Sequence, residues 1–319
     1  MQTKQNYLDD VREILDTSAR VHATTFNPEY CFDSIIDEGD VRIAVKASIT
    51  IDNVESHIRE ELMKICSILR CIPLIVGERT RKRPLQDGVV HIRGSIPAIS
   101  LETFRRMLEE KIYPVLLTKK GGIYVIMNGE KLKKAREALS LSRGDIANEL
   151  GLSRRAIYEY ERGSISPKID IALRLEELLN ASLIEPLNLF ETITSSSDSQ
   201  RSEELVTKQT RLTKRTLEIL SRLGFNSTIA HDAPFDLLTS LQKHIVLSYL
   251  EQRLERLNED RLEFLAKLAQ VLKEEPAIIA SDSPTVEAIS GIPVIYLKEL
   301  ISLENPSEFI MLIHNRRGA

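Results

Sequence analysis

Two adjacent arginines, Arg154 and Arg155, lie in the stretch LGLSRRAIYEYERG and carry the most specific chemistry in this sequence. A guanidinium group holds its donors in a planar fork that matches O6 and N7 of guanine, with roughly 1–3 kcal/mol of discrimination for each good pair. To reach a base edge, such a side chain must project from an element that fits the major groove, such as an α-helix. The surrounding sequence must therefore supply that helix.

Asp33 and Lys46 have the spacing of part of a metal-dependent nuclease site. In that layout one strand carries an aspartate and a second strand, about eleven residues later, ends in acid-x-Lys, so that two carboxylates hold a divalent ion and the lysine steadies the attacked phosphate. This sequence has Ala44 where the second acid belongs. The pattern resembles a restriction-endonuclease-like or junction-resolvase-like domain that has lost half of its metal site, and we expect no catalytic residue, metal or cofactor.

The first domain, residues 1–125, has the hydrophobic periodicity of a mixed α/β fold. Its expected helices and strands lie at 5–16, 18–24, 32–37, 41–47, 53–69, 72–76, 89–92 and 95–108. A basic run inside this domain could bind phosphate, although an exposed loop would look the same; it consists of Arg79, Arg81, Lys82 and Arg83.

Residues 126–192 change to a purely helical period, which predicts a small all-α domain. A Ser-x-x-Asp start, Ser142 with Asp145, predicts that a second helix begins at Arg143, and Gly151 suits the positive φ at its end. The buried faces of the first two helices are expected to hold Leu132, Ala135, Leu139, Ile146, Ala147 and Leu150.

A third helix is expected after Ser153, whose hydroxyl can cap it. Ile157 and Tyr160 would face inward, which leaves Arg154, Arg155, Tyr158 and Glu159 outward at or near the first turn. A fourth helix, at about 168–179, would close the core with Ile171, Ala172, Leu175 and Leu178.

The segment LSRGDIANELGLSRRAIYEYERG resembles the helix-turn-helix of the lambda-repressor/Cro family, and the whole match, from residue 129 to about residue 180, covers about a sixth of the chain. In that family the first turn of the third helix reads base edges, which by position implies Arg154 and Arg155, with Tyr158 and Glu159 as secondary candidates. Many members have Gln where this chain has Arg143, and a phosphate contact there remains plausible. The implied contacts to the DNA backbone are Lys133, Lys134, Arg143, Ser153, Arg162, Ser164, Ser166 and Lys168.

The residues after the helical segment form a predicted linker at 193–204, which is polar and Ser-rich, and a second α/β domain at 205–319. Ordered similarities join the two α/β domains: the segments at 31–47, 53–69, 72–76 and 95–104 match those at 234–250, 261–273, 276–280 and 291–300. In the second copy Asp236 remains, but Leu247 and Tyr249 stand where the acid and the lysine would be. A metal site there is still less expected.

The whole arrangement resembles a family of archaeal helix-turn-helix regulators in which a Cro-like domain lies between two such α/β units. The net charge of −4 argues against a chain that coats nucleic acid indiscriminately, and no apolar run approaches the roughly 18 residues of a membrane span. Three sparse cysteines, Cys31, Cys66 and Cys71, indicate buried thiols and neither a disulfide framework nor zinc. We therefore expect a cytoplasmic, multidomain protein.

The predicted function is sequence-specific binding of double-stranded DNA by a transcriptional regulator, with no membrane partner. A single module buries too little surface for high specificity, so a homodimer on a two-fold-related site is expected, with the α/β domains supplying the dimer or a partner surface. Two alternatives stay open. One is a structure-selective nuclease that uses Asp33, Lys46 and a second, unrecognised carboxylate; the other is a bridging factor whose helices bind the transcription machinery.

Overall fold

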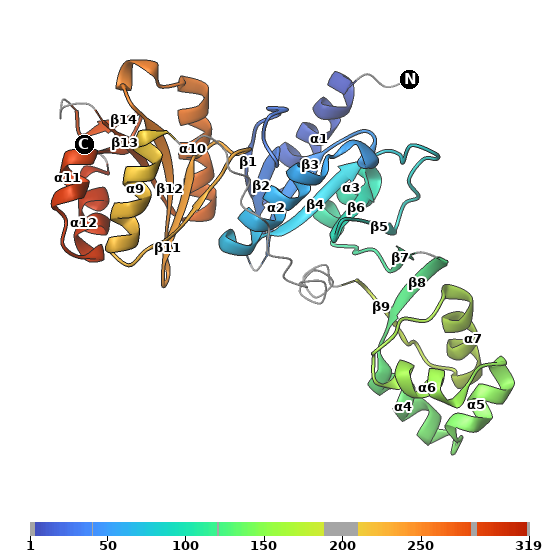
Figure 1. Ribbon diagram of the computed structural model, residues 1–319. Coiled ribbons are helices and arrows are strands. Elements are labelled where there is room, and N and C mark those ends of the chain that lie inside the picture. The colour runs from blue at the N-terminus through green and yellow to red at the C-terminus, as the bar shows by residue number, and fades with distance from the viewer. Residues whose placement is uncertain (1–3, 40, 120, 188–209, 282–285, 318–319) are drawn as a thin grey trace. The chain divides into compact units, whose positions relative to one another are not determined.

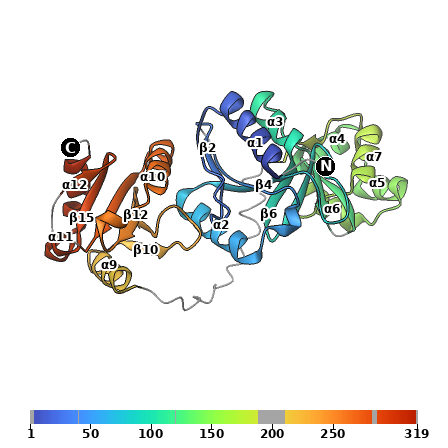
Figure 2. The ribbon, with the colours of Figure 1, turned by 90° about the horizontal axis from the view of Figure 1, so that it is seen from above.

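The computed structural model describes residues 4–39, 41–119, 121–187, 210–281 and 286–317, so the predicted linker at 193–204 lies outside the described residues. The described residues fall into two compact units (Figures 1 and 2). One contains residues from 4–47, 54–73 and 210–319, and the other contains residues from 48–53 and 74–187, within the described ranges. In the part of the chain that is described, no helix is both long and apolar enough to cross a bilayer.

The first unit opens with helix α1 (Lys4–Ser18), whose buried residues Tyr7, Val11, Ile14 and Leu15 follow the period of one helix face. Three antiparallel strands and a long helix follow it: β1 (Val21–Thr24), β2 (Ser34–Asp37), β3 (Arg42–Ala47) and α2 (Ser56–Leu69). Each of these elements lies at or near a position predicted from the sequence.

The C-terminal part of the same unit is a six-stranded mixed sheet in the order β10-β11-β12-β13-β15-β14. Its strands are β10 (Asn226–Ile229), β11 (Leu237–Leu241), β12 (His244–Glu251), β13 (Glu275–Ala280), β14 (Ala288–Ile289) and β15 (Ile292–Tyr296). Its helices are α9 (Arg211–Arg222), η2 (Leu254–Arg256), α10 (Glu259–Leu272), α11 (Leu297–Ser302) and α12 (Pro306–Arg316). Side chains from α9, α12 and the sheet share one apolar core, which includes the edge-on ring pair Phe225 and Phe309.

The second unit contains the last residues of β4 (Ile72–Gly77) in a mixed sheet, followed by the helical region. In this sheet β4 pairs parallel to β6, β6 antiparallel to β5, β5 parallel to β7, and β7 antiparallel to β8. The elements are η1 (Ile51–Asn53), β5 (Val89–Arg93), β6 (Ile96–Ser100), α3 (Leu101–Glu109), β7 (Leu116–Lys119) and β8 (Gly122–Met127). Ser100 ends β6 and caps α3 directly, so no separate turn lies between strand and helix.

The internal similarity predicted between the two α/β domains is present in their strand pairing. β1, β2 and β3 form an antiparallel set, as do β10, β11 and β12, and the parallel pair β4 with β6 matches β13 with β15. The amides of Asp33 and Asp236 both donate to the neighbouring strand, to the carbonyls of Val45 at 2.7 Å and Ser248 at 2.8 Å. Two mixed α/β domains therefore flank the helical region along the chain.

The helical region consists of α4 (Gly129–Ala138), α5 (Arg143–Leu150), α6 (Arg154–Glu161) and α7 (Ile169–Leu179). The prediction of a purely helical domain was wrong in one respect, because the two-residue strand β9 (Ile184–Glu185) pairs antiparallel with the end of β8. The amide of Asn128 also donates to the carbonyl of Leu183 at 2.9 Å. The two ends of the helical segment are therefore joined.

Candidate nucleic-acid interface

Helices α5 and α6 form the helix-turn-helix, and local hydrogen bonds fix the turn between them. Ser142 and Asp145 form a capping box, with amide-to-side-chain distances of 2.7 Å and 3.2 Å. Gly151 ends α5 in the left-handed region with a φ of 67°. The Ser153 hydroxyl accepts from the amide of Ala156 at 3.1 Å at the start of α6. These helix boundaries confirm the ones predicted from the sequence.

The predicted core holds α6 against the other helices. Its buried side chains are Met127, Leu132, Ile146, Ala147, Leu150, Ile157, Tyr160, Leu175, Leu179 and Leu183. Gly129 lies so close to the carbonyl of Glu161 that a Cβ there would overlap the backbone of α6, so α4 and α6 can approach only with glycine at this position. The prediction for Leu139 was wrong: α4 ends at Ala138, and Leu139 is half exposed.

Arg154 and Arg155 occupy the first two positions of α6, but their surroundings differ. Arg155 projects into solvent with 88% of its side chain exposed, and a 3.9 Å contact to Glu159 is too long for a hydrogen bond. The guanidinium of Arg154, also an exposed residue, lies over Gly144 in α5, where a Cβ would be 2.8 Å from Arg154 Nε. Arg155 is therefore almost fully exposed, with only a loose ion pair to Glu159, whereas the guanidinium of Arg154 packs against the preceding helix.

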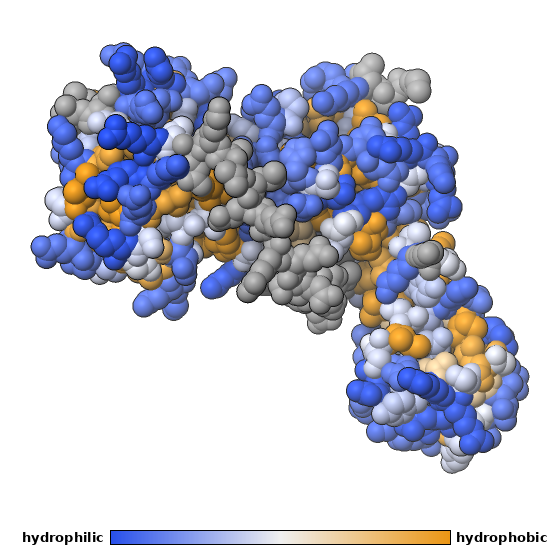
Figure 3. Space-filling view, viewed as in Figure 1, coloured by the Kyte–Doolittle hydropathy of each residue, from blue (hydrophilic) through white to orange (hydrophobic). Residues whose placement is uncertain are grey.

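Tyr158 lies between two arginines at the ends of the helix-turn-helix. The guanidinium carbon of Arg143 is 5.2 Å from the centre of the ring, and that of Arg162 is 5.5 Å from it. Glu159 lies one position further along α6, with only a quarter of its side chain exposed. The structure thus brings Arg143, Tyr158 and Arg162 together. In Figure 3, hydrophilic residues cover much of the visible surface of the helical region as a whole.

An ion-pair network under the helix-turn-helix was missed by the sequence reasoning. Glu161, with 3% of its side chain exposed, accepts from Arg136 Nε at 2.6 Å and from Arg143 Nε at 2.7 Å. Burial alone would raise the pKa of Glu161, but hydrogen bonds from Arg136 and Arg143 outweigh it and lower that pKa. The signal was present, since Glu161 follows Ile157 by four residues and so shares its buried helix face.

The other predicted backbone-contacting residues are distributed over the helix ends. Lys134, Ser164 and Lys168 are exposed, Lys133 and Ser166 are half-buried, and Lys168 is the residue before the first turn of α7. Ser153 is exposed as well, although its hydroxyl already serves as a helix cap. Most of this set is therefore accessible to a ligand.

The degenerate nuclease-like position is closed around Asp33. Its Oδ1 is 3.1 Å from Lys46 Nζ, its Oδ2 accepts from the amide of Ala47 at 2.7 Å, and Lys46 also donates to the carbonyl of Tyr30 at 2.6 Å. Asp33 is 4% exposed and Ala44 is fully buried. Burial raises the pKa of Asp33 to about 6, against the opposing effects of Lys46 and the Ala47 amide. The structure brings the predicted pair together, but as a buried ion pair.

The corresponding position of the C-terminal domain uses a different cation. Asp236 accepts from the amide of Leu250 at 2.7 Å and from Arg261 Nη2 at 2.9 Å. Arg261 comes from α10 and lies 4.1 Å from the centre of the Tyr249 ring, which occupies the place of the lysine. The sequence pattern did not reveal Arg261, because it reaches Asp236 from a helix and not from the adjoining strand.

These two positions lie close to the contact between the two α/β parts of the first unit. The amide of Cys31 donates to the carbonyl of Asp232 at 2.7 Å, and the rings of Tyr30 and Phe32 each lie 6.4 Å from that of Phe264. The packing is reciprocal, because α2 contacts β11 while its counterpart α10 contacts β2. The contact thus limits access to Asp33.

Replacing Asp33 by asparagine is expected to remove a pH dependence of stability. Because the pKa of about 6 exceeds the ordinary 3.8, the folded state binds this proton more tightly, and the wild type loses stability as the pH rises from about 4 to about 6. The stability of Asp33→Asn relative to the wild type should rise by up to roughly 3 kcal/mol between pH 4 and pH 7 in denaturant titrations. The exposed Asp9→Asn is the control, and parallel curves for Asp33→Asn and the wild type would contradict the assignment.

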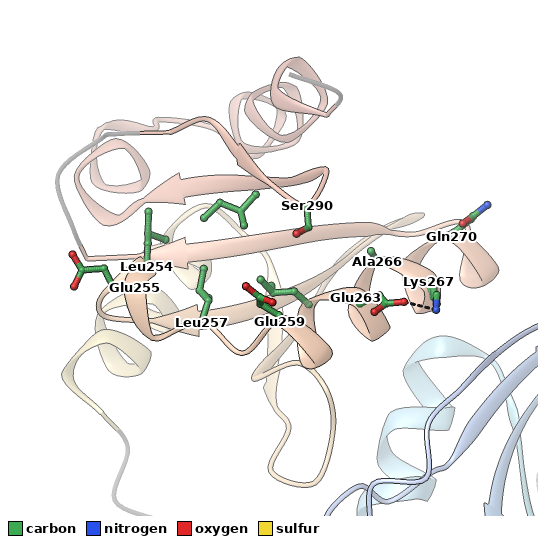
Figure 4. A pocket seen from close by; sticks show the side chains of 11 residues that line it. Leu254, Glu255, Leu257, Glu259, Glu263, Ala266, Lys267, Gln270 and Ser290 are labelled. Atoms are coloured by element: carbon green, nitrogen blue, oxygen red, sulfur yellow. Dashed lines mark hydrogen bonds and ion pairs between the residues drawn. The ribbon is translucent and has the colours of Figure 1, made fainter.

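Among the described residues, a metal-binding cluster is absent and a large cavity in the C-terminal domain is not cationic. Within the described ranges, no three His, Cys, Asp or Glu side chains are grouped to hold a metal ion. A cavity of about 760 Å³ lies between η2, α10 and the turn after β14 (Figure 4). Its lining includes Glu255, Glu259 and Glu263, the last paired with Lys267 at 2.6 Å, and this acidic surface repels an anion.

Comparisons with known proteins agree with this architecture. Residues 4–114 match the family described as "PD-(D/E)XK superfamily domain", and residues 132–185 match the one described as "Helix-turn-helix". No solved structure gives a significant match.

Several archaeal proteins are similar to this chain over most of its length, and all are named as proposed HTH-type transcriptional regulatory proteins. The one from Methanocaldococcus jannaschii is 32% identical over 284 residues, which cover 88% of this chain and 87% of the relative. The Thermoplasma acidophilum protein is 33% identical and covers 97% and 94%, and the Methanobrevibacter smithii protein is 28% identical and covers 99% of each. The chain therefore belongs to this archaeal family of proposed HTH-type transcriptional regulators, and it combines a PD-(D/E)XK superfamily domain with a helix-turn-helix domain.

Proposed function

We propose that the protein is a sequence-specific DNA-binding transcriptional regulator that places α6 in the major groove. The observation that carries this proposal is the start of α6, where Arg155 is almost fully exposed on a helix whose two ends are capped and whose inner face is buried. An immobile helix loses little conformational freedom when its side chains dock on base edges. The names of the relatives support the same role.

We assign direct base contacts to Arg155 and Arg154, with Tyr158 and Glu159 as secondary contacts. Because Arg154 is braced on α5 and Arg155 is not, Arg154 reaches a base at lower entropic cost and Arg155 has the wider reach. Contacts to the phosphate backbone are assigned to Lys133, Lys134, Arg143, Ser153, Arg162, Ser164, Ser166 and Lys168. Arg143 can keep its bond to Glu161 and still present its remaining donors, since it is partly exposed.

The active species we infer is a homodimer acting in the cytoplasm on two half-sites, because one helix-turn-helix module buries too little surface for high specificity. We retain the division into domains at 1–125, 126–192 and 205–319, with a linker at 193–204, as part of this proposal. The short pair of β8 with β9 supports a boundary near residue 126, since it closes the helical segment on itself.

The nuclease alternative receives little support from the geometry. Asp33 is buried and paired with Lys46, and a fully buried Ala44 stands at the position of the second carboxylate. The metal-dependent mechanism needs two carboxylates to hold the divalent ion, and the second one is missing from this position. We therefore propose that the α/β domains do not cut DNA.

Selection of bound sequences from a pool of random duplex DNA tests the proposal. We expect full-length protein at 0.15 M salt to enrich a preferred site, with guanine at the positions facing Arg154 and Arg155 and with two-fold symmetry in the site. A pool that shows no enrichment would overturn sequence-specific binding and favour the bridging alternative. Cleavage of the pool when magnesium is present would favour the nuclease.

A further inference from the structure

The strongest unexplained feature is the basic loop, residues 78–84, which the proposed function does not use. Its backbone is held in one conformation. The Thr80 hydroxyl accepts from the amides of Lys82 and Arg83, and the Thr80 amide donates to the carbonyl of Arg83 at 2.8 Å. The amides of Glu78 and Arg79 both donate to the carbonyl of Ile49 at 3.0 Å. The loop is therefore an ordered part of the α/β fold.

An aspartate and an arginine outside the loop complete this arrangement. Asp52 accepts from the amide of Arg81 at 2.7 Å through one carboxylate oxygen and from Arg93 Nε at 2.6 Å through the other. Both carboxylate oxygens of Asp52 are thus engaged, and they hold the loop backbone and Arg93 in place.

The loop concentrates positive charge in a chain whose net charge is −4. Its four cationic residues are all exposed: Arg79, Arg81, Lys82 and Arg83. Among the described residues, no carboxylate lies within 4.0 Å of their charged nitrogens. Arg93 adds a fifth cation, and it is ion-paired with Asp52. The positive charge also affects a neighbouring buried residue. Burial lowers the pKa of His91, and the positive charges of Arg93 and Arg83 lower it further.

We propose that the basic loop binds the phosphodiester backbone of duplex DNA, independently of base sequence, as a contact surface additional to the helix-turn-helix. Guanidinium groups pair with phosphate oxygens in a bidentate manner, and a fixed loop loses little entropy when it does so. An exposed cation gains little from a single small anion, whereas a polyanion meets several cations at once and releases condensed counterions. The exposed setting thus favours an extended polyanion.

The test compares two matched double variants of the full-length protein, Lys82→Gln with Arg83→Gln in the loop and Arg211→Gln with Lys214→Gln in α9. The α9 residues are also exposed, so each variant removes one exposed arginine and one exposed lysine. Binding to a random 30-base-pair duplex (about three helical turns) is followed by fluorescence anisotropy as a function of salt. The loop variant should lower the salt slope by about 1.8 and weaken binding roughly tenfold or more, and the α9 variant should change neither.

Two further results separate this inference from the helix-turn-helix proposal and from a small ligand. The loop variant should lose the same factor of affinity for a selected site as for a random duplex, so that its sequence preference is unchanged. If the helix-turn-helix proposal fails, the effect of the loop variant on the salt slope should still be observed. Equal salt slopes for the two double variants would overturn the inference. The inference would also be overturned if the loop variant lost binding of inorganic pyrophosphate but kept the DNA affinity of the wild type. Circular dichroism confirms that both variants are folded.

Discussion

Replacing Arg154 and Arg155 together by alanine is expected to lower the affinity for a selected DNA site by about a hundredfold or more. Two bidentate pairs with guanine, each contributing roughly 1–3 kcal/mol, account for a loss of this size. Affinity for random duplex should fall by less than about tenfold, because most phosphate contacts come from other residues. Competition binding at one stated salt concentration measures both values.

Arg155→Lys is the sharper companion variant, because lysine keeps the charge and loses the planar fork. It should relax the preference at one base of the site and leave the salt slope unchanged. Arg211→Ala with Lys214→Ala is the control for the double alanine variant, because it also removes two positive charges, from exposed residues of α9. Full sequence preference in Arg155→Lys would show that Arg155 contacts phosphate and not a base.

Replacing Glu161 by alanine is expected to destabilise the helical region by about 3–5 kcal/mol. The change leaves Arg136, which is 8% exposed, without its main counter-charge and unable to reach water. Since domains of ordinary size are stable by about 5–15 kcal/mol, this loss brings α4 to α7 close to unfolding. Hydrogen–deuterium exchange measured by mass spectrometry should show faster exchange in these helices, with the α/β sheets unchanged.

Glu137→Ala is the matched control for Glu161→Ala. Glu137 also pairs with Arg136, at 3.2 Å, but more than half of its side chain is exposed, so its loss should cost less than about 1 kcal/mol. Glu161→Gln keeps an acceptor for Arg136 and should lie between the two. If Glu161→Ala exchanges as slowly as Glu137→Ala, the buried network does not support the helix-turn-helix.

The features that the sequence predicted well are those decided over a few residues. Ser142, Gly151 and Ser153 were placed correctly because a cap needs only its own helix turn and a favoured backbone conformation. Leu139 was misplaced because the apolar period continued one residue past the end of α4. The exposed start of α6 follows from the same local signals, and so do Arg154 and Arg155 as its first residues.

The features that were missed depend on partners far apart in the chain. The strand β9 has two residues and is recognisable only by its pairing with β8, in which Met127 and Ile184 are 57 residues apart and Ile126 and Glu185 are 59 apart. Arg136 and Glu161 are 25 residues apart, and neither charge by itself indicates burial. Arg261 pairs with Asp236 from helix α10, so the pattern of the strand that contains Tyr249 gives no sign of this ion pair. Hydrophobic periodicity shows which face of a single helix or strand is buried, but it does not show which distant side chain that face will contact.

The first and last residues of the helical segment are hydrogen-bonded to each other, which bears on how the segment fits into the α/β fold. The Asn128 amide donates to the Leu183 carbonyl at 2.9 Å, and Met127 pairs with Ile184, so the chain enters and leaves the helical segment at neighbouring positions. A segment whose two ends lie this close can be accommodated between the strands of a sheet with little displacement of the flanking chain.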